Sequence, residues 1–262
     1  MNSPGYIDTH CHLAMHPLVE DVPGVIARAR DCGISRMLVV ASDEKSSQGV
    51  TDLVERYSSE ELSAAVGIHP HDAKNCPGGL PAEIRELAGL PTVAAIGETG
   101  LDYYYDHSPR EVQRALFREH IALARDLGKP LVVHVRNAYD DALQILEEER
   151  ASDCGGVIHC FSATVEYARK AMELGFYISF SGLVTFPNAG NLRKTAALLP
   201  EEVILCETDA PFLAPQPVRG KTNEPANVRF VYEEIARSRG VALDDLVAVV
   251  ERNAMRLFGW RV

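Results

Sequence analysis

The chain has 262 residues, of which 46% are hydrophobic and 24% charged, and its formal net charge is −11. This composition is typical of an ordinary globular protein, and the length matches the roughly 250 residues of a (β/α)8 barrel. No apolar run approaches the roughly 20 residues that a membrane-spanning helix needs. The excess of acidic residues argues against extended binding to a nucleic-acid duplex, which usually requires a basic face, but it does not exclude a short phosphodiester that enters a cleft.

The start of the chain and its cysteines indicate a cytoplasmic protein. Residues 1–5 have neither a basic region nor an apolar core, so no secretory signal is expected there. The six cysteines are scattered without a C-x-x-C pair, which favours reduced thiols over a disulfide framework.

Short apolar segments rich in β-branched residues alternate with longer segments of helical periodicity, which predicts repeated β–α units and a parallel sheet. The candidate strands are residues 6–10, 37–41, 62–68, 92–97, 131–135, 156–160, 176–180 and 203–207. The candidate helices are residues 23–32, 44–57, 81–87, 109–127, 138–149, 164–174, 189–199, 226–239 and 243–258. Eight such units most simply form a single α/β domain over residues 1–262, a (β/α)8 TIM barrel, although an open doubly wound sheet has the same local pattern.

His10 and His12 follow the first apolar run. Side chains alternate between the two faces of a strand, so these two imidazoles point the same way. Other candidate strands also end in polar residues, and the carboxyl ends of barrel strands meet at one end of the barrel. Buried polar groups need a shared partner, and a metal ion would satisfy them together. The residues at these ends are His10, His12, His69, His71, Glu98, His134, Arg136, His159, Glu207 and Asp209.

The sequence resembles the TatD family of metal-dependent deoxyribonucleases, a branch of the amidohydrolase-like barrels, over essentially its whole length. The segments that carry the resemblance are Asp8-Thr9-His10-Cys11-His12, Gly67-Ile68-His69-Pro70-His71, Gly97-Glu98-Thr99-Gly100-Leu101-Asp102, Pro130-Leu131-Val132-Val133-His134-Val135-Arg136, His159-Cys160-Phe161-Ser162, Glu207-Thr208-Asp209-Ala210-Pro211 and Arg219-Gly220-Lys221-Thr222-Asn223-Glu224-Pro225.

The resemblance implies a centre for two divalent metal ions. His10, His12 and Asp209 would hold one ion, His134 and His159 the other, and Glu98 would bridge them, since a carboxylate has two oxygens and an imidazole lone pair serves one cation. Asp209 would also orient or deprotonate the attacking water. Zinc, manganese and magnesium are the expected ions, although such a histidine-rich site offers less oxygen than magnesium prefers.

The implied activity is hydrolysis of phosphodiester bonds in DNA, as a 3′-5′ exonuclease on short or single-stranded ends, with cleavage at abasic sites and a role in DNA repair. An alternative is a metal-dependent ester or amide hydrolase, for example a D-aminoacyl-tRNA deacylase, because one metal centre serves many substrates. A non-catalytic metal-binding module is a third reading. The expected assembly is a monomer or a small homo-oligomer without a membrane partner.

The substrate contacts are predicted from charge and position. His71, Arg136, Arg219 and Lys221 are expected to bind phosphate groups, the arginines by bidentate contact. Tyr103, Tyr104 and Tyr105 would either stack on bases or pack against the barrel rim. His69 and His71 each have either a substrate role or a structural one. His120 lies in a candidate helix and is expected at the surface.

Overall fold

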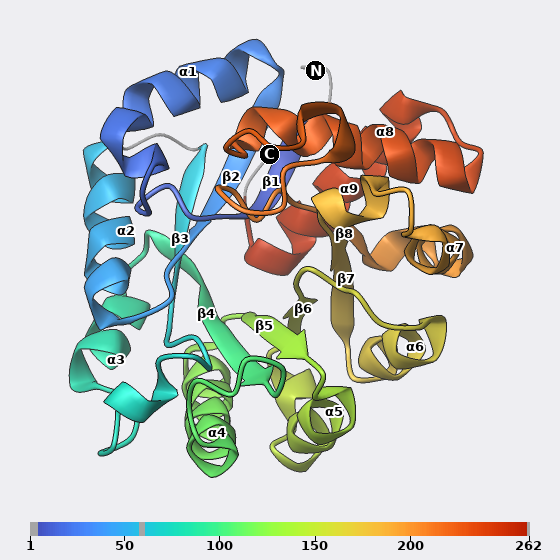
Figure 1. Cartoon of the computed structure of the whole chain (residues 1–262). Coiled ribbons are helices and arrows are strands. Elements are labelled where there is room, and N and C mark those ends of the chain that lie inside the picture. Colours follow the sequence, from blue (N-terminus) through green and yellow to red (C-terminus); the bar gives the residue numbers. More distant parts are fainter. Residues whose placement is uncertain (1–4, 58–60, 261–262) are drawn as a thin grey trace.

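The alternating segments fold into a barrel of parallel strands. The computed structural model describes residues 5–57 and 61–260, and within them the strands form one sheet in the order β1 to β8, each pair parallel. A parallel bridge between Cys11 and Ala210 brings the end of the sheet back to β1 (Figure 1). The predicted (β/α)8 barrel is therefore confirmed. The strands are β1 Tyr6–Cys11, β2 Ile34–Val40, β3 Leu62–Val66, β4 Val93–Asp102, β5 Leu131–Arg136, β6 Gly156–Ile158, β7 Phe176–Phe180 and β8 Ile204–Cys206.

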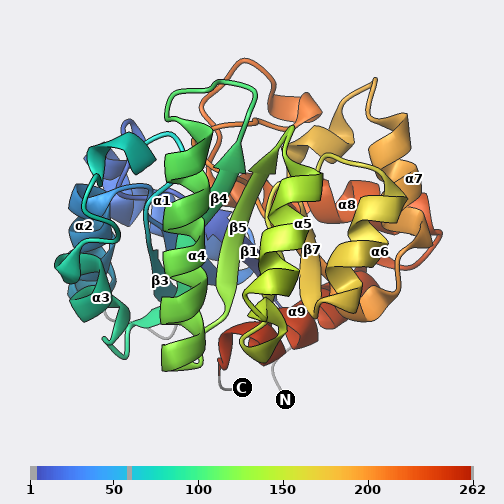
Figure 2. The ribbon, with the colours of Figure 1, turned by 90° about the horizontal axis from the view of Figure 1, so that it is seen from below.

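Helices surround the strands on the outside of the barrel (Figure 1). Figure 2 shows α9 across the lower end of the barrel, whereas longer loops rise above the opposite end, toward which β4 and β5 point. That upper end is the carboxyl end of the strands. The helices are α1 Val22–Asp31, α2 Glu44–Arg56, α3 Ala82–Ala88, α4 Arg110–Leu127, α5 Tyr139–Glu148, α6 Val165–Glu173, α7 Gly190–Leu198, α8 Val228–Arg239 and α9 Leu243–Phe258.

Local sequence signals set several helix ends. Asp43 accepts a hydrogen bond from the Ser46 amide at 2.6 Å, and the Ser46 hydroxyl accepts one from the Asp43 amide at 2.9 Å, which together cap α2. Gly128 ends α4 with a left-handed φ of 62°, a conformation that glycine adopts without a steric penalty. Both ends lie where the sequence predicts them.

Strand β4 is longer than predicted. The prediction ended it at Gly97, but the strand continues to Asp102. At Gly100, where φ is +135°, a Cβ atom would lie 2.0 Å from the carbonyl oxygen of His134. Glycine thus permits a close approach to β5 instead of ending the strand. As a result, Glu98 lies inside a strand. β6 and β8 are shorter than predicted and end before His159 and Glu207.

His120 is fully buried, so its predicted surface position is wrong. It lies on the face of α4 that packs inward with Leu116 and Phe117. Its Nδ1 bonds to the Leu116 carbonyl oxygen at 2.8 Å, and its Nε2 accepts a hydrogen bond from the Ile68 amide at 3.0 Å. The ring is therefore a neutral imidazole with Nδ1 protonated, and burial lowers its pKa to about 4.

We expect His120 to make the protein sensitive to acid. Its pKa is lower in the folded state than the ordinary value, so the unfolded chain binds the proton more readily, and the stabilisation that is present above pH 6.5 is lost as the pH falls toward 4. Between pH 7 and pH 5 the loss is about 2 kcal/mol. His120→Gln, which does not titrate, should reduce the fall in unfolding free energy over this range, measured by urea denaturation. His16→Gln is the matched control because His16 is exposed; equal pH dependence in wild type and His120→Gln would contradict the prediction.

Within the described residues, no helix combines the length and apolar character needed to cross a membrane. The six cysteines all lie in the described part of the chain, and each is a free thiol.

Candidate metal centre

The six side chains predicted as metal ligands converge at the carboxyl end of the barrel. They come from five places on the ring of strands, and the barrel brings together residues almost 200 positions apart in the sequence. The centre is largely buried. Of His10, His12 and Asp209, the aspartate has the most exposed side chain, with 14% of it accessible. The six are His10 at the end of β1 and His12 after it, Glu98 in β4, His134 in β5, His159 after β6 and Asp209 after β8.

The first group consists of His10, His12 and Asp209. The Nε2 atoms of the two imidazoles lie 3.1 Å apart. Oδ1 of Asp209 is 3.7 Å from Nε2 of His10 and 3.4 Å from Nε2 of His12. On the other side of the His12 ring, Nδ1 donates to the carbonyl oxygen of Val40 at 2.9 Å. This bond fixes the tautomer, so the lone pair of Nε2 faces His10 and Asp209.

The second group consists of His134 and His159. Nδ1 of His134 lies 3.4 Å from Nε2 of His159, and these atoms are 3.1 Å and 2.8 Å, respectively, from Oε1 of Glu98. The other carboxylate oxygen of Glu98, Oε2, faces the first group, at 3.5 Å from His10 and 3.8 Å from His12. The two oxygens of one carboxylate are thus divided between the two groups.

His69 lies beside this centre, although sequence reasoning left its role open. Its Nε2 is 3.5 Å from Oε1 of Glu98, and its Nδ1 accepts a hydrogen bond from the amide of His71 at 3.1 Å. Burial lowers the pKa of His69 well below its usual value, so the ring is neutral. An imidazole whose Nδ1 is an acceptor carries its proton on Nε2. His69 therefore presents a hydrogen-bond donor to the centre.

Carboxylates behind the histidines were missed or left without a role. Asp102 Oδ2 accepts hydrogen bonds from Nε2 of His134 and Nε2 of His71, each at 3.0 Å, and Glu207 Oε1 lies 3.2 Å from Nδ1 of His159. Such bonds hold an imidazole in one tautomer and orientation. Asp102 belongs to the segment Gly97–Asp102 that resembles the family, but its place behind His134 becomes evident only because β4 extends past Gly100.

Asp8 was missed although it belongs to the first motif. It is fully buried, and its carboxylate accepts hydrogen bonds from the Thr208 amide at 2.8 Å and the Thr208 hydroxyl at 2.6 Å. Burial raises the pKa of Asp8 to about 8, against the opposing effect of these bonds. Its spacing of two residues from His10 was a usable signal, because residues two apart share one face of a strand. Asp8 therefore ties β1 to the segment after β8.

The charges of the cluster depend on one another. Burial disfavours the ionised form of Glu98, but the neighbouring imidazoles outweigh it and hold its pKa well below the usual value. Burial also disfavours the imidazolium of His159, but Glu98 and Glu207 outweigh it and raise its pKa well above the usual value. For His10 burial dominates, and the pKa is lowered. Ionised carboxylates among imidazoles form a set that releases protons when a divalent cation binds.

The chemistry of these donors fits a divalent metal ion. Three sets of side chains in the described structure place one potential ligand atom from each residue within 4.8 Å of the others: His10, His12 and Asp209; His10, His159 and Glu207; and His69, Glu98 and His134. Imidazole nitrogen and carboxylate oxygen suit zinc and related divalent metals. Two buried polar atoms beside them, Nδ1 of His10 and Oε2 of Glu207, have no hydrogen-bond partner among the described residues. The site is thus built for a charged or polar guest.

We expect Asp102→Asn to weaken metal binding without unfolding the barrel. Asparagine retains the shape of the side chain but loses the negative charge that holds the Nε2 protons of His134 and His71. Removing such a supporting carboxylate typically costs about 10- to 100-fold in metal affinity or activity. The affinity is measured by equilibrium dialysis against zinc or manganese. Asp52→Asn, on the exposed face of α2, is the matched control; unchanged affinity in Asp102→Asn would show that Asp102 is not needed to orient His134.

The predicted substrate-binding residues occupy the rim. His71 is half-buried and bonds to Asp102, while the guanidinium of Arg136 lies over the ring of Tyr104 at 4.3 Å and that of Tyr105 at 4.6 Å. Arg219 lies over Phe186 at 4.0 Å, and Lys221 is exposed on the same loop after β8. The structure thus places His71 and Arg136 next to the centre, and Arg219 and Lys221 on the loop beyond it.

The three tyrosines differ in their surroundings. The hydroxyl of Tyr103 donates to Asp141 at 2.8 Å and accepts from Arg114 at 2.8 Å, which packs this side chain against the outer helices. The rings of Tyr104 and Tyr105 are about half-exposed, although both lie against the guanidinium of Arg136. Packing thus accounts for Tyr103, and base stacking by Tyr104 and Tyr105 stays a prediction.

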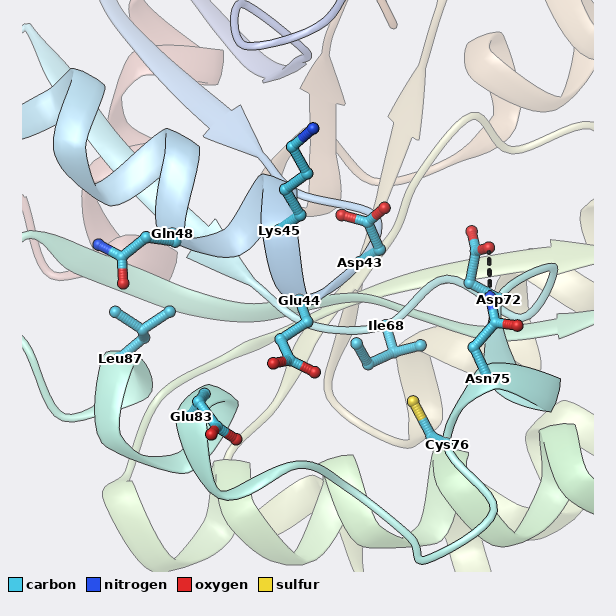
Figure 3. A pocket seen from close by; sticks show the side chains of 10 residues that line it. All are labelled: Asp43, Glu44, Lys45, Gln48, Ile68, Asp72, Asn75, Cys76, Glu83 and Leu87. Carbon is cyan, nitrogen blue, oxygen red and sulfur yellow. Dashed lines mark hydrogen bonds between the residues drawn. The ribbon is translucent and has the colours of Figure 1, made fainter.

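A separate pocket of about 480 Å³ lies outside the barrel, between α2, α3 and the segment after β3 (Figure 3). None of the six predicted ligands lines it. Its walls carry the carboxylates of Asp43, Glu44, Asp72 and Glu83 beside a single cation, Lys45. Such a lining repels phosphate, so we do not assign substrate binding to this pocket.

Comparisons with known proteins agree with the site. Residues 7–259 match the family described as TatD related DNase. The chain is 44% identical over 255 residues to the uncharacterized metal-dependent hydrolase YcfH of Escherichia coli K12, covering 96% of this chain and 95% of that protein. It is 34% identical over 257 residues to the 3′-5′ ssDNA/RNA exonuclease TatD of Shigella flexneri, covering 96% and 98%.

A solved structure shows the same architecture. The TatD homologue YJJV from Escherichia coli K12 has a TM-score of 0.89 and 29% sequence identity, and the match covers 97% of this chain and 98% of that one. The family match, over residues 7–259, runs from β1 through α9. The chain therefore belongs to the TatD family of metal-dependent hydrolases.

Proposed function

We propose that this hydrolase is a divalent-metal-dependent deoxyribonuclease that removes nucleotides from the 3′ end of single-stranded DNA and also cleaves at abasic sites. The observation that carries the proposal is the division of the Glu98 carboxylate, with one oxygen toward His10 and His12 and the other toward His134 and His159. A carboxylate placed in this way is suited to bridge two cations. Paired cations are a common device for phosphodiester hydrolysis.

The proposed centre holds two ions, of zinc, manganese or magnesium. His10, His12 and Asp209 would hold one, His134 and His159 the other, and Glu98 both. When bound, paired ions lower the pKa of water and stabilise the attacking and leaving oxygens of an in-line displacement.

The remaining work falls to side chains around the centre. Burial disfavours the ionised form of Asp209, but hydrogen bonding to His12 and the charges of the other imidazoles outweigh it and lower the pKa of the carboxyl, so the group is ionised and suited to orient the attacking water. His69 would donate a hydrogen bond from Nε2–H to an oxygen of the phosphate. Arg136 would hold a neighbouring phosphate from the rim, and His71, Arg219 and Lys221 would extend that contact along the strand.

The choice of DNA is supported by the family description, and the choice of the 3′ end by the name of the Shigella flexneri relative, which gives single-stranded DNA and RNA as its substrates. The net charge of −11 favours short or single-stranded ends over long duplexes. We place the activity in DNA repair in the cytoplasm.

The test is cleavage of single-stranded DNA labelled at the 3′ or the 5′ end by metal-loaded protein, with and without chelator. The expected result is metal-dependent shortening from the 3′ end, one nucleotide at a time. No cleavage of DNA by protein shown to contain its metals would exclude the nuclease proposal. Esters and amides, including D-aminoacyl-tRNA, would then be the substrates to assay.

A further inference from the structure

Phe212 is a half-exposed aromatic side chain beside the candidate metal centre. It lies three residues after Asp209 and is 50% exposed. Its ring centroid is 6.1 Å from that of His12, in an edge-to-face arrangement. Single exposed apolar residues are common on protein surfaces, so the exposure of Phe212 does not by itself indicate a binding site. Its position beside His12 and its anchored backbone are more informative.

The backbone around Phe212 is held from three sides. Its amide donates to the Asp209 carbonyl oxygen at 2.9 Å, and its own carbonyl oxygen accepts from Nδ2 of Asn223 at 2.7 Å. Asn223 is completely buried and donates also to the Thr208 carbonyl oxygen at 3.0 Å. The next residue, Leu213, packs so closely on Gly182 that a Cβ atom there would lie 2.1 Å from the Leu213 carbonyl oxygen. The backbone that carries the Phe212 ring is therefore held in place beside the centre.

Exposed rings also line the opposite rim. Tyr104 and Tyr105 are 57% and 49% exposed and follow β4, which is four strands away from β8 around the barrel. Figures 1 and 2 show the green loop after β4 and the orange loop after β8 rising on different sides of the same end of the barrel. The guanidinium of Arg136 already covers both tyrosine rings. Among the described residues, Phe212 makes a ring contact with His12 only, so a face of its ring is left to solvent.

We propose that Phe212 is a stacking position for the base of a nucleotide that flanks the scissile phosphate. The inference rests on the proposed nuclease function and extends it: the enzyme would recognise the nucleobase as well as the phosphate. Stacking accepts every base, because each has a π-face, which suits an exonuclease that must proceed through any sequence. Preorganisation matters here because the anchored backbone of Phe212 has little freedom left to lose when a base binds.

The test is a cycle that pairs protein and substrate changes. Oligonucleotides carry either a normal base or a base-free tetrahydrofuran residue at the 3′-terminal or the penultimate position, and each is cleaved by wild type, Phe212→Leu and Phe212→Tyr. Removing a stacked base should lower kcat/KM of the wild type about 5- to 150-fold. Phe212→Leu should raise KM for the normal substrate and respond little to loss of the base, while Phe212→Tyr should resemble wild type. Independent effects of the two changes at both positions would overturn the proposal.

A second readout does not depend on turnover. Fluorescence of 2-aminopurine at the same positions, in an oligonucleotide whose terminal linkage is a poorly cleaved phosphorothioate, should be quenched by wild type and Phe212→Tyr but not by Phe212→Leu. Leu198→Ala, which removes an equally exposed apolar side chain at the end of α7, is the control. Equal quenching by Phe212→Leu, with its circular dichroism unchanged, would reject stacking. If the oligonucleotides are cleaved but the effects of the Phe212 substitution and of base removal are independent, the stacking proposal is wrong and the nuclease proposal stands. If no oligonucleotide is cleaved, the nuclease proposal is wrong, and the fluorescence quenching still tests whether Phe212 stacks on a base.

Discussion

Replacing Glu98 by glutamine is expected to lower the rate of hydrolysis on the order of 10³-fold or more, because the loss of one bridging charge removes several kcal/mol of transition-state stabilisation. Glutamine has nearly the same shape, but only one of its two terminal atoms is an oxygen, whereas the two oxygens of Glu98 face different histidine groups. The measurement is single-turnover cleavage of end-labelled single-stranded DNA, together with metal content by mass spectrometry. Metal content should fall with activity.

The control for Glu98→Gln is Glu83→Gln, on α3 in the separate acidic pocket. That variant changes the net charge equally but leaves the centre intact, so its activity and metal content should match wild type. If Glu98→Gln retains near wild-type activity with a full complement of metal, Glu98 does not bridge two ions. A protein that only binds a partner would keep that affinity in both variants.

Asp209→Asn is expected to reduce activity on a similar scale, on the order of 10³-fold, while part of the bound metal is retained. The ion pairs of the Asp209 carboxylate within the described structure are with His10 and His12, at 3.7 Å and 3.4 Å. Its loss should therefore empty one metal position and spare the one formed by His134 and His159. Metal analysis should give roughly half the wild-type content, and the residual activity should show a changed pH profile, because the ionised carboxylate beside the attacking water is gone.

A suitable control for Asp209→Asn is Asp244→Asn, which lies in the first turn of α9 at the other end of the barrel. Its metal content and pH profile should equal those of wild type. Loss of all metal from Asp209→Asn would mean that the two groups bind cooperatively as one unit. Full activity in Asp209→Asn would remove Asp209 from the mechanism.

The strands and helices were predictable because their signals are local. β7 and α9 have the predicted bounds, and the cap at Asp43 and the stop at Gly128 lie where the sequence places them. The end of β4 was not predictable in this way. The neighbours of Gly100 in the sequence do not show why a glycine is needed there. It leaves room for the backbone of β5, which begins 31 residues later in the chain.

The candidate ligands were predicted and the residues that support them were not, for a related reason. The six candidate ligands and Asp102 all lie in segments that resemble the family, but the role of Asp102 depends on which histidine nitrogen faces it, and that is seen only in the structure. His120 could have been placed inside, since it lies three and four residues from Phe117 and Leu116 on one face of α4. Its hydrogen bond to the Ile68 amide is a contact between distant segments that no local pattern encodes.

The way in which the barrel closes has a consequence for folding. β1 and the segment after β8 are joined by the bonds from Thr208 to Asp8, 200 residues apart, and by the bridge between Cys11 and Ala210. The proposed ligands His10 and His12 stand on one side of this seam and Asp209 on the other. A cation bound there would link the two ends of the barrel. This metal position would therefore be complete only after the segment that follows β8 has been synthesised and has packed against β1.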